Sequence, residues 1–536
     1  MALTKAWQGP YVIQDDARSH VVWMLRFINP DLFPADWIIN YFQSVAPWGY
    51  KTLYQVLAAI GIHPFTANYL LPTALGLITT GYAFGVCWQI FPVPVAGFLT
   101  TLLLNQNLWL KDDLITATPR AFFYPLFLGF LYYFLRQSRS GMIGTIIVLS
   151  AFYPQGVLLV LGILTLHLIR LLVTQQLTIS ASNRFTVLIS LGVGILTLLP
   201  HLLNTSEFGP VITLSEARNL PEFYPGGRAA FFTDQPWDFW ITGDRSGLLP
   251  QEWFRKSIPP QVFAGFLLPV LLKFPQRFPL VQKVNRNAIL LPEILLASTG
   301  LFLLAHAFLF RLHHPSRYSQ HSLRIVAAIA GGIVITILLD FFRQRFIIQT
   351  LWPKVGLFAL LFVLLCYPSL FNRFPTTNYV VGRYSALYEF LANTPLDTRI
   401  ASIASQVNNL PAFTQRSILV GSEYALPYHQ GYYAEIQQRA EALAQAQYSS
   451  DLAEMKSLIQ QYGINLWLIE SNFSEPDYID QNSFFQIVNP QITQQIKENL
   501  NKENQPVLTR FMGDRTVFKV DNFQVLDTTC LLRSQK

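Results

Sequence analysis

A succession of long apolar runs between residues 69 and 371 constrains this chain most. Ten of the runs are candidate membrane spans: 69–91, 93–109, 119–136, 141–153, 157–174, 184–203, 258–273, 288–311, 322–341 and 354–371. A helix needs about 20 apolar residues to cross a bilayer, so the runs at 93–109, 141–153 and 258–273 are expected to be tilted, broken or re-entrant. Only 13% of the residues are charged, roughly half the share in soluble domains. The sequence therefore predicts an α-helical polytopic membrane protein with about ten transmembrane helices.

Lys and Arg in the loops indicate how the spans are oriented. Alternate loops gather basic residues, and Asp340 is the one acid close to them: Arg136 and Arg139; Arg170 and Arg184; Lys273, Arg277, Lys283 and Arg286; Arg343, Arg345 and Lys354. Since basic loops stay in the cytoplasm, residues 1–68, the long loop 204–257, the loop 311–321 and the C-terminal region are expected outside it. The chain contains no run of Lys and Arg of the kind that is typical of nucleic-acid binding.

Composition divides the chain into three predicted domains. Residues 1–68 are polar and aromatic, contain no run long enough to span, and predict a first outer loop with short helices on the membrane surface. Residues 69–371 are the multi-span domain, which includes the outer loop 204–257. Residues 372–536 predict an extracytoplasmic α/β domain, because short apolar strands alternate with helical segments. The strands are expected at 399–404, 417–420, 465–470 and 516–520, and the helices at 381–393, 432–446, 450–462 and 485–499.

The first candidate site is the stretch 14–20, with the adjacent carboxylates Asp15 and Asp16. A positioned carboxylate can act as a general base, and carboxylates also bind Mg²⁺ or Mn²⁺, which suit phosphate-bearing substrates. Arg18 and His20 can steady an anion or the carboxylates themselves. The alternative is a helix N-cap, since Asp before an amphipathic run is typical of a helix start.

A second acidic pair, Asp112 and Asp113, follows Lys111 at the outer end of a span. Ionisable groups at such a position are candidates for function. The alternative is a capping role, with Lys111 neutralising Asp112.

The outer loop 312–318 is the third candidate site, and it contains His313, His314, Arg317 and Tyr318, with His321 and Arg324 behind it. Arginine binds phosphate through two parallel hydrogen bonds, so this loop can grip a phosphate or pyrophosphate. A histidine pair can also ligate Zn²⁺, but no third ligand is close in the sequence. The alternative is an interfacial loop whose long side chains reach the headgroup zone.

Together these features resemble the GT-C superfamily of polytopic glycosyltransferases, which use polyprenyl-phosphate sugar donors. Asp15-Asp16 is similar to the acidic pair of that family's first outer loop, and Asp112-Asp113 to the acids of its second. The loop 313–318 resembles the late outer loop that contacts donor phosphate. The region around 411–424 resembles the family's extracytoplasmic domain, in the style of uncharacterised bacterial members.

The sequence departs from the family in two respects. The oligosaccharyltransferase signature Trp-Trp-Asp-Tyr-Gly is absent. Family members carry a transmembrane helix before the first acidic loop, and only fourteen residues precede Asp15, so that first helix is expected to be missing.

The resemblance implies an enzyme in which Asp15 or Asp16 activates an acceptor hydroxyl and the lipid phosphate departs with inversion. It implies that His313, His314, Arg317 and Tyr318 bind the donor phosphate, and that Asp16 and Asp112 hold Mg²⁺ or Mn²⁺ where an ion is used. The implied partners are a lipid-linked sugar, membrane lipid and an extracytoplasmic glycan, lipid or protein acceptor. The implied location is the bacterial plasma membrane. The alternative is a non-catalytic protein that binds or transports the lipid carrier, such as a degenerate transferase.

Overall fold

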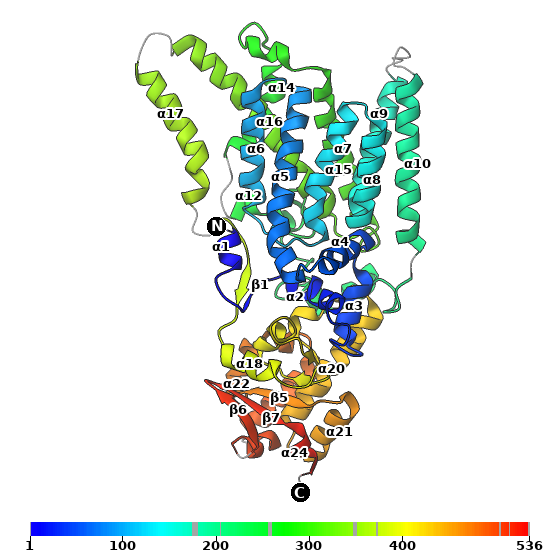
Figure 1. The fold of residues 1–536 in the computed structure, drawn as a ribbon, viewed down its shortest axis with the longest axis vertical. Coiled ribbons are helices and arrows are strands. Elements are labelled where there is room, and N and C mark those ends of the chain that lie inside the picture. Colours follow the sequence, from blue (N-terminus) through cyan, green and yellow to red (C-terminus); the bar gives the residue numbers. More distant parts are fainter. Residues whose placement is uncertain are drawn as a thin grey trace.

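The computed structural model describes residues 2–173, 181–203, 205–255, 260–346, 351–370, 374–502, 505–513 and 515–533. A bundle of helices occupies one end of the long axis and a β-sheet with its helices occupies the other (Figure 1). Short helices from the N-terminal residues lie between them. The predicted combination of a helical membrane part and an α/β region is confirmed.

The helices of the bundle follow the apolar runs of the sequence. They are α5 (Pro64–Ile90), α6 (Pro94–Leu108), α7 (Phe123–Leu135), α8 (Arg139–Phe152), α9 (Pro154–Val173), α10 (Ala181–Leu203), α15 (Leu290–Ala307), α16 (Ser316–Phe346) and α17 (Leu351–Cys366). The short run at 258–273 is broken, as expected, into α13 (Pro260–Phe263), a 3₁₀ turn (Ala264–Leu267) and α14 (Leu268–Leu271). A proline at the start of α14 supplies no N–H for a continuous helix, which explains the break.

Five of the described helices are long and apolar enough to cross a bilayer, namely α5, α9, α10, α15 and α16. Large apolar side chains such as Leu77 and Phe358 are 70% and 71% exposed on the bundle. Helices that are apolar on their outer faces need lipid around them. The chain is therefore a multi-pass integral membrane protein.

Helix α16 is central to the bundle and packs against α6, α15 and the broken segment 260–271. Gly332 allows α16 and α6 to approach closely, because a Cβ at this position would collide with Thr100. This contact fixes the start of α16 beside the loop that follows α6, and both carry candidate site residues.

The C-terminal sheet has the strand order β4-β3-β5-β7-β6. Strands β4 (Ser417–Ile418), β3 (Arg399–Ala401) and β5 (Leu466–Glu470) are parallel, while β7 (Phe523–Asp527) runs antiparallel to β5 and to β6 (Thr516–Val520). The surrounding helices include α18 (Ser385–Ala392), α20 (Gln430–Tyr448), α21 (Leu452–Tyr462), α22 (Pro476–Gln481), α23 (Pro490–Asn501) and α24 (Thr528–Arg533). The four predicted strands are present, and β7 is a strand that the sequence analysis missed.

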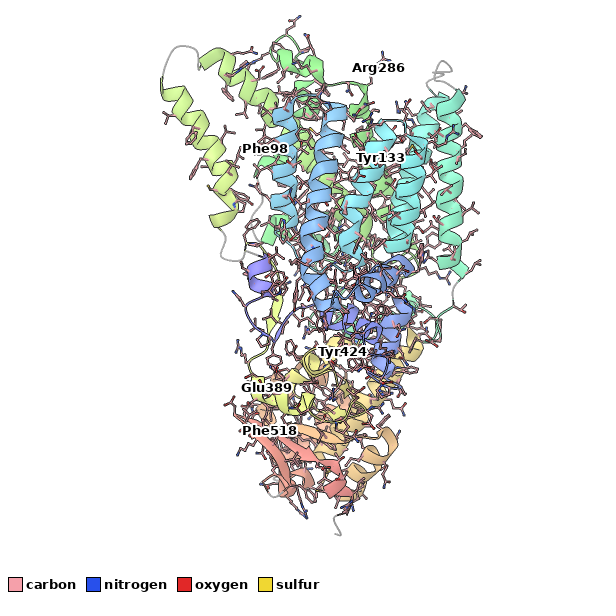
Figure 2. The ribbon with its side chains drawn as sticks, viewed as in Figure 1. Phe98, Tyr133, Arg286, Glu389, Tyr424 and Phe518 are labelled. Carbon is pink, nitrogen blue, oxygen red and sulfur yellow. The ribbon has the colours of Figure 1, made fainter. Side chains whose placement is uncertain are left out.

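The N-terminal residues join the two ends of the molecule. They form α1 (Ala2–Ala6), β1 (Val12–Gln14), α2 (Ala17–His20), a 3₁₀ helix (Val22–Phe27), α3 (Trp37–Val45) and α4 (Trp48–Ala59). Strand β1 pairs antiparallel with β2 (Tyr379–Val381), which follows the bundle in the sequence. Figure 2 shows Tyr424 at the junction, where its ring lies 6.1 Å from that of Phe42 in α3.

The aromatic residues of this N-terminal region face protein as well as the membrane surface. Trp48 is exposed, as expected of an interfacial residue, but Tyr41, Phe42 and Tyr50 are at most 2% exposed. The ring of Tyr41 stacks on Tyr432 of α20 at 3.6 Å. Some aromatic side chains of these helices are therefore covered by protein, and the placement of the helices on the membrane surface stays a prediction.

Candidate active site

The two acidic pairs meet at the end of the bundle that faces the C-terminal region, and Arg120 joins them. Its Nη2 lies 2.6 Å from Asp16 Oδ2 and 3.4 Å from Asp112 Oδ1, and its Nε lies 3.6 Å from Asp113 Oδ1. Arg120 belongs to the 3₁₀ turn Pro119–Phe122 that leads into α7. The first and second acidic stretches, far apart in the sequence, thus form one site.

The backbone of β1 positions Asp16. Pairing with β2 fixes the strand, and the N–H of Asp15 donates to the carbonyl of Asn378 at 3.1 Å. Asp16 then occupies the N-cap position of α2, but its side chain makes no capping hydrogen bond. Since this carboxylate binds Arg120 instead, the capping alternative does not describe its side chain.

The charge of Asp16 is set by its cationic neighbours. Burial raises the pKa of the Asp16 carboxyl, but nearby cations, Arg120 foremost, outweigh this effect and hold the pKa below its ordinary value. Arg317 is one of those cations. Asp16 is therefore ionised at neutral pH, and the charge of Arg317 in the loop 312–318 contributes to this.

Asp15 points elsewhere, toward the C-terminal region. Its carboxylate pairs with Arg18, which also lies 3.1 Å from Glu423 Oε2. Glu423 in turn pairs with Arg228 of the long loop 204–257. Asp15 is thus part of a chain of ion pairs that links three regions, and the adjacent carboxylates have different surroundings.

Asp112 and Asp113 also differ from one another. Asp113 is fully buried, and its Oδ2 accepts hydrogen bonds from Tyr124 at 3.0 Å and Arg324 at 2.9 Å. Burial raises the pKa of the Asp113 carboxyl, but Lys111 and other cations hold it well below its ordinary value. The pKa of Asp112 is raised, because burial outweighs the effect of Arg120. Neither side chain caps a helix.

The ion pairs of Lys111 join it to acids of the long loop 204–257, while its charge also acts on Asp112. Its Nζ lies 2.7 Å from Asp244 and 3.5 Å from Glu252, both in the long loop 204–257. Glu252 also lies 2.6 Å from Arg324 Nη2. The complete charge network contains Asp16, Asp112, Arg120, Asp113, Arg324, Glu252, Lys111 and Asp244.

The late loop is a tight turn that leads into α16. Phe310 and His313 both have φ of 65° and are bridged to each other. The hydroxyl of Tyr318 donates to the carbonyl of Leu312 at 2.6 Å, and His314 Nε2 lies 3.0 Å from the hydroxyl of Tyr428. Tyr318 therefore holds the turn closed, and His314 ties it to the C-terminal region.

Arg317 is the free charge of this loop. Within the described parts of the chain, its guanidinium forms no ion pair or side-chain hydrogen bond. Burial and the nearby Arg317 lower the pKa of His313 to about 3, and burial keeps the pKa of His314 well below its ordinary value. Both histidines are neutral at pH 7, so the positive charge of the loop comes from Arg317.

The predicted metal ligands do not fit a divalent ion as they stand. Among the described residues, no group of three or more His, Cys, Asp or Glu side chains is arranged to hold a metal. Asp16 and Asp112 both point at Arg120, whose guanidinium takes the position between them that a bridging ion would need.

The sequence analysis missed Glu252 and Asp244, and it gave no place in a charge network to four other residues: Arg120, Arg324, Arg228 and Glu423. Arg324 offered a signal, because it is a charge within an apolar run, and such residues are rare unless they have a partner. The others lie in polar stretches, where a charged residue is ordinary.

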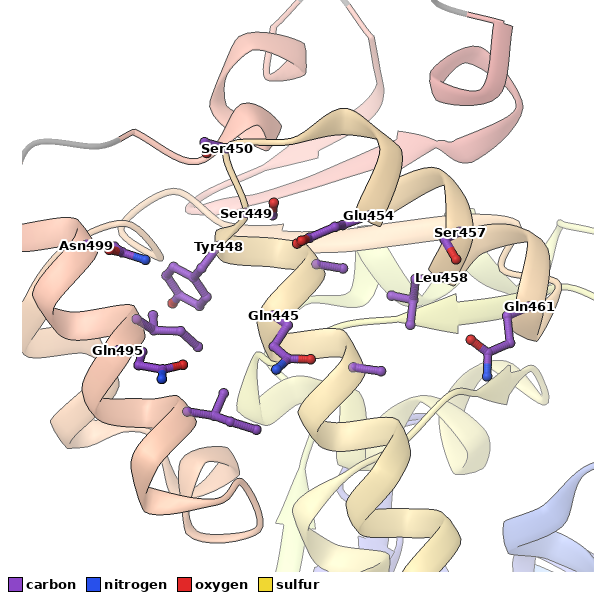
Figure 3. Close-up of a pocket in the computed structure, with 14 residues that line it drawn as sticks. Gln445, Tyr448, Ser449, Ser450, Glu454, Ser457, Leu458, Gln461, Gln495 and Asn499 are labelled. Carbon is purple, nitrogen blue, oxygen red and sulfur yellow. The ribbon is translucent and has the colours of Figure 1, made fainter.

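A groove of about 670 Å³ lies apart from this network, between α20, α21 and α23 (Figure 3). Its rim carries uncharged polar side chains such as Gln445, Gln461 and Gln495, and Glu454 is its single carboxylate. It contains none of the predicted site residues.

The fold and the site define a class of polytopic membrane protein, in which carboxylates and arginines lie between a helical bundle and an α/β region. Comparison with solved structures shows a fold similar to that of archaeal oligosaccharyltransferases. Neither a family model nor a curated protein matches the sequence.

The solved structures similar to this chain include oligosaccharyltransferases from Archaeoglobus fulgidus. One, tethered with an acceptor peptide containing the NVT sequon, has a TM-score of 0.56 and 9% identity, covering 91% of this chain and 68% of that one. AglB, with an inhibitory peptide and a dolichol-phosphate, has a TM-score of 0.52 and 10% identity, covering 93% and 71%. ArnT from Cupriavidus metallidurans, bound to undecaprenyl phosphate, has 14% identity over 100% and 98%, with a TM-score of 0.48. The predicted resemblance to the superfamily is confirmed for the fold.

Proposed function

We propose that this protein is a membrane glycosyltransferase that moves a sugar from a polyprenyl-phosphate carrier to an extracytoplasmic acceptor. Two groups at one end of the polytopic bundle carry the proposal: the ionised carboxylate of Asp16, and Arg317, which is one of the cations acting on that carboxylate and has no ion pair among the described residues. Displacement at a sugar carbon needs a base for the incoming hydroxyl and a cation for the departing phosphate. Solved proteins of the same fold bind an acceptor peptide and a dolichol-phosphate, which supports the two substrate classes.

Asp16 is the proposed base. Arg120 holds Oδ2, which leaves Oδ1 available to accept the proton of the acceptor hydroxyl. As the acceptor hydroxyl loses its proton to Asp16, its oxygen attacks the anomeric carbon and the bond from that carbon to the lipid phosphate breaks. The configuration at the anomeric carbon therefore inverts. Asp15 is engaged with Arg18 and is proposed to position the strand and α2.

Arg317 is proposed to receive the departing phosphate, whose negative charge grows in the transition state. Neutral His313 and His314 can add hydrogen bonds but no charge. The buried Nδ1 of His314 has no hydrogen-bond partner in the described chain, so it remains available to a ligand. Tyr318 supports this arrangement from behind, because its hydroxyl closes the turn.

The orientation and the domain division belong to the same proposal. The basic loops face the cytoplasm of a bacterial cell, and residues 1–68, the loop 204–257 and the domain 372–536 lie outside. A reporter that is active only in the cytoplasm, fused after Lys536, should be silent. A strong signal would reverse the orientation and exclude an outer acceptor.

The experiment that tests the base compares Asp16→Asn with Asp15→Asn. General-base assistance is worth about 10²–10⁴-fold, so Asp16→Asn should nearly abolish transfer from labelled polyprenyl-phosphate sugars in membranes. Asp15→Asn is the matched control and should retain most of the transfer. Size-exclusion profiles in detergent should be unchanged in both variants.

Two outcomes would contradict the proposal. Equal transfer by the parent and Asp16→Asn would remove the base assignment. A parent that binds labelled carrier lipid but transfers none of the sugars offered would favour the alternative, a protein that only binds or moves the carrier.

A further inference from the structure

Three carboxylates converge on a single guanidinium in this site. Arg120 lies within 3.6 Å of oxygens from Asp16, Asp112 and Asp113. Hard divalent ions prefer several carboxylate and water oxygens around one point. In this site a positively charged side chain occupies the point that the three carboxylates face, and among the described residues no group of three or more such side chains is placed to hold an ion.

The hydrogen-bonded turn around Arg120 holds its guanidinium in place. The hydroxyls of Thr116 and Thr118 are 2.8 Å apart, and Asn68 of α5 donates to the carbonyl of Thr116 at 2.7 Å. After Pro119, the side chains of Ala121 and Phe122 are buried, which anchors the turn on both sides of Arg120. Arg120 is therefore fixed among the acids and does not behave as a mobile surface residue.

The chemistry of arginine suits a permanent role of this kind. A guanidinium stays charged at every physiological pH and presents several donors in one plane, so it can hold more than one carboxylate. Removing it would leave three converging carboxylates with fewer counter-charges, and like charges at such distances repel strongly. An ion would then be the alternative way to neutralise them.

We propose that Arg120 takes the place of a divalent cation in this site, so that the protein neither binds such an ion at Asp16 and Asp112 nor requires one for transfer. Arg120 is then a positioning residue: it orients Asp16 Oδ1 toward the acceptor and balances the charge of the acidic pairs. The inference rests on the proposed function for its catalytic consequence, while its ion-binding consequence stands on the geometry alone.

The test is a titration of purified protein with Mn²⁺, followed by electron paramagnetic resonance of the free ion. The parent should bind no equivalent of Mn²⁺ that depends on Asp16 at concentrations up to about 1 mM, the weak end of oxygen-ligand ion sites. Arg120→Ala should gain one equivalent, and the double variant Arg120→Ala/Asp16→Asn should lose it again. Stoichiometric binding by the parent that Asp16→Asn abolishes would overturn the proposal.

Transfer assays supply the second readout. Parent activity should persist after treatment with EDTA, whereas Arg120→Ala should lose most activity and recover part of it with added Mn²⁺. Arg120→Lys keeps the charge without the planar fork and should bind no Mn²⁺. EDTA-sensitive parent activity restored by Mn²⁺ would overturn the proposal.

The two proposals fail in different ways. Absence of sugar transfer by the parent would remove the proposed function and leave the Mn²⁺ titration to decide the role of Arg120. If Arg120→Ala does not fold, Arg120→Lys and the parent titration still decide.

Discussion

The charge network has two halves with similar residues and different surroundings. The outer half, around Arg120, is partly exposed, and the inner half, around Arg324, is buried. In the outer half, Asp16 and Asp112 have side chains 24% and 15% exposed and share one arginine. In the inner half, Asp113 and Glu252 are buried and divide the fork of Arg324 at 2.9 Å and 2.6 Å. The inner acids share Arg324, and Glu252 also lies close to Lys111, whereas in the outer half Arg120 holds Asp16 by Oδ2 and leaves its Oδ1 without an ion pair or hydrogen bond among the described residues. Partner number and exposure, more than residue type, separate structural from chemical carboxylates here.

The inner half connects three parts of the fold. Arg324 comes from α16, Asp113 from the loop after α6, and Glu252 from α12 (Glu252–Arg255) in the long outer loop. Buried ion pairs add little net stability when complete, but breaking one leaves a charge without compensation. Truncation of a side chain in the inner half is thus expected to lower the stability of the protein, whereas binding of substrate is expected to leave this half unchanged.

The largest effect is expected from Arg324→Ala. It would leave Asp113 and Glu252 buried without their shared partner, which should cost about 3–5 kcal/mol of unfolding free energy. Thermal unfolding in detergent would show it. The matched control is Arg343→Ala, whose 68% exposed side chain pairs with Asp340 and should contribute no more than about 1 kcal/mol. Equal losses in the two variants would break the comparison between buried and exposed pairs.

Neighbouring acids provide the next comparison. Asp113→Asn weakens a buried pair and should cost about 3 kcal/mol of stability. Because burial raises the pKa of the Asp112 carboxyl, folding disfavours its charged form, so Asp112→Asn should cost less stability than Asp113→Asn, yet reduce sugar transfer. Unfolding curves and transfer rates would be measured for both. A reversed order of stability would show that the assignment of inner and outer halves is wrong.

A smaller effect is expected at the late loop. Arg317→Ala should weaken use of the lipid donor by about 2 kcal/mol, because a charge-assisted phosphate contact is lost. Arg218 is exposed in the loop 204–257, and Arg218→Ala is the control with unchanged donor use. The measurement is transfer against donor concentration. Matching losses in the two variants would take the phosphate role away from Arg317.

The smallest effect concerns pH. Burial lowers the pKa of His313, so the unfolded chain takes up a proton near pH 6.5 and the folded chain does not. Stability from this group is therefore complete above that pH and declines as pH falls toward the lowered pKa. His313→Gln should reduce the loss of stability between pH 6.5 and 5.5 by about 1 kcal/mol relative to the parent. Identical pH profiles of thermal unfolding would mean that His313 titrates normally in the fold.

Local patterns in the sequence predicted the elements of the fold. Apolar runs located the bundle helices, including the broken one at 258–273, and alternating apolar segments located four strands. The strand at 523–527 was missed because its polar positions, Gln524 and Asp527, disguise a buried strand beside β5. The aromatic residues at 41–50 predicted helices at the membrane surface, but Tyr41, Phe42 and Tyr50 are buried in protein, because no local pattern says whether lipid or protein covers a ring.

The candidate site was predictable as a set of stretches and not as a set of contacts. Sequence placed Asp15 and Asp16 together, and nothing local distinguishes them. The difference comes from Arg120, 104 residues away from Asp16. Arg324 and Asp113 are 211 residues apart. Contacts of this range depend on how helices pack, which short-range patterns do not encode.

The pairing of β1 with β2 has a consequence for biosynthesis. The strand β1, directly before Asp15 and Asp16, is made before the bundle helices, but its partner at residues 379–381 emerges only after every bundle helix. The hydrogen bond of 3.0 Å that Arg18 donates to Asn409 likewise cannot form until Asn409, 391 residues later in the chain, has been made. The nascent chain is therefore expected to leave the ribosome with an unassembled acidic stretch, which is ordered in the last stage of folding. Membrane insertion and completion of the site are then separate events in time.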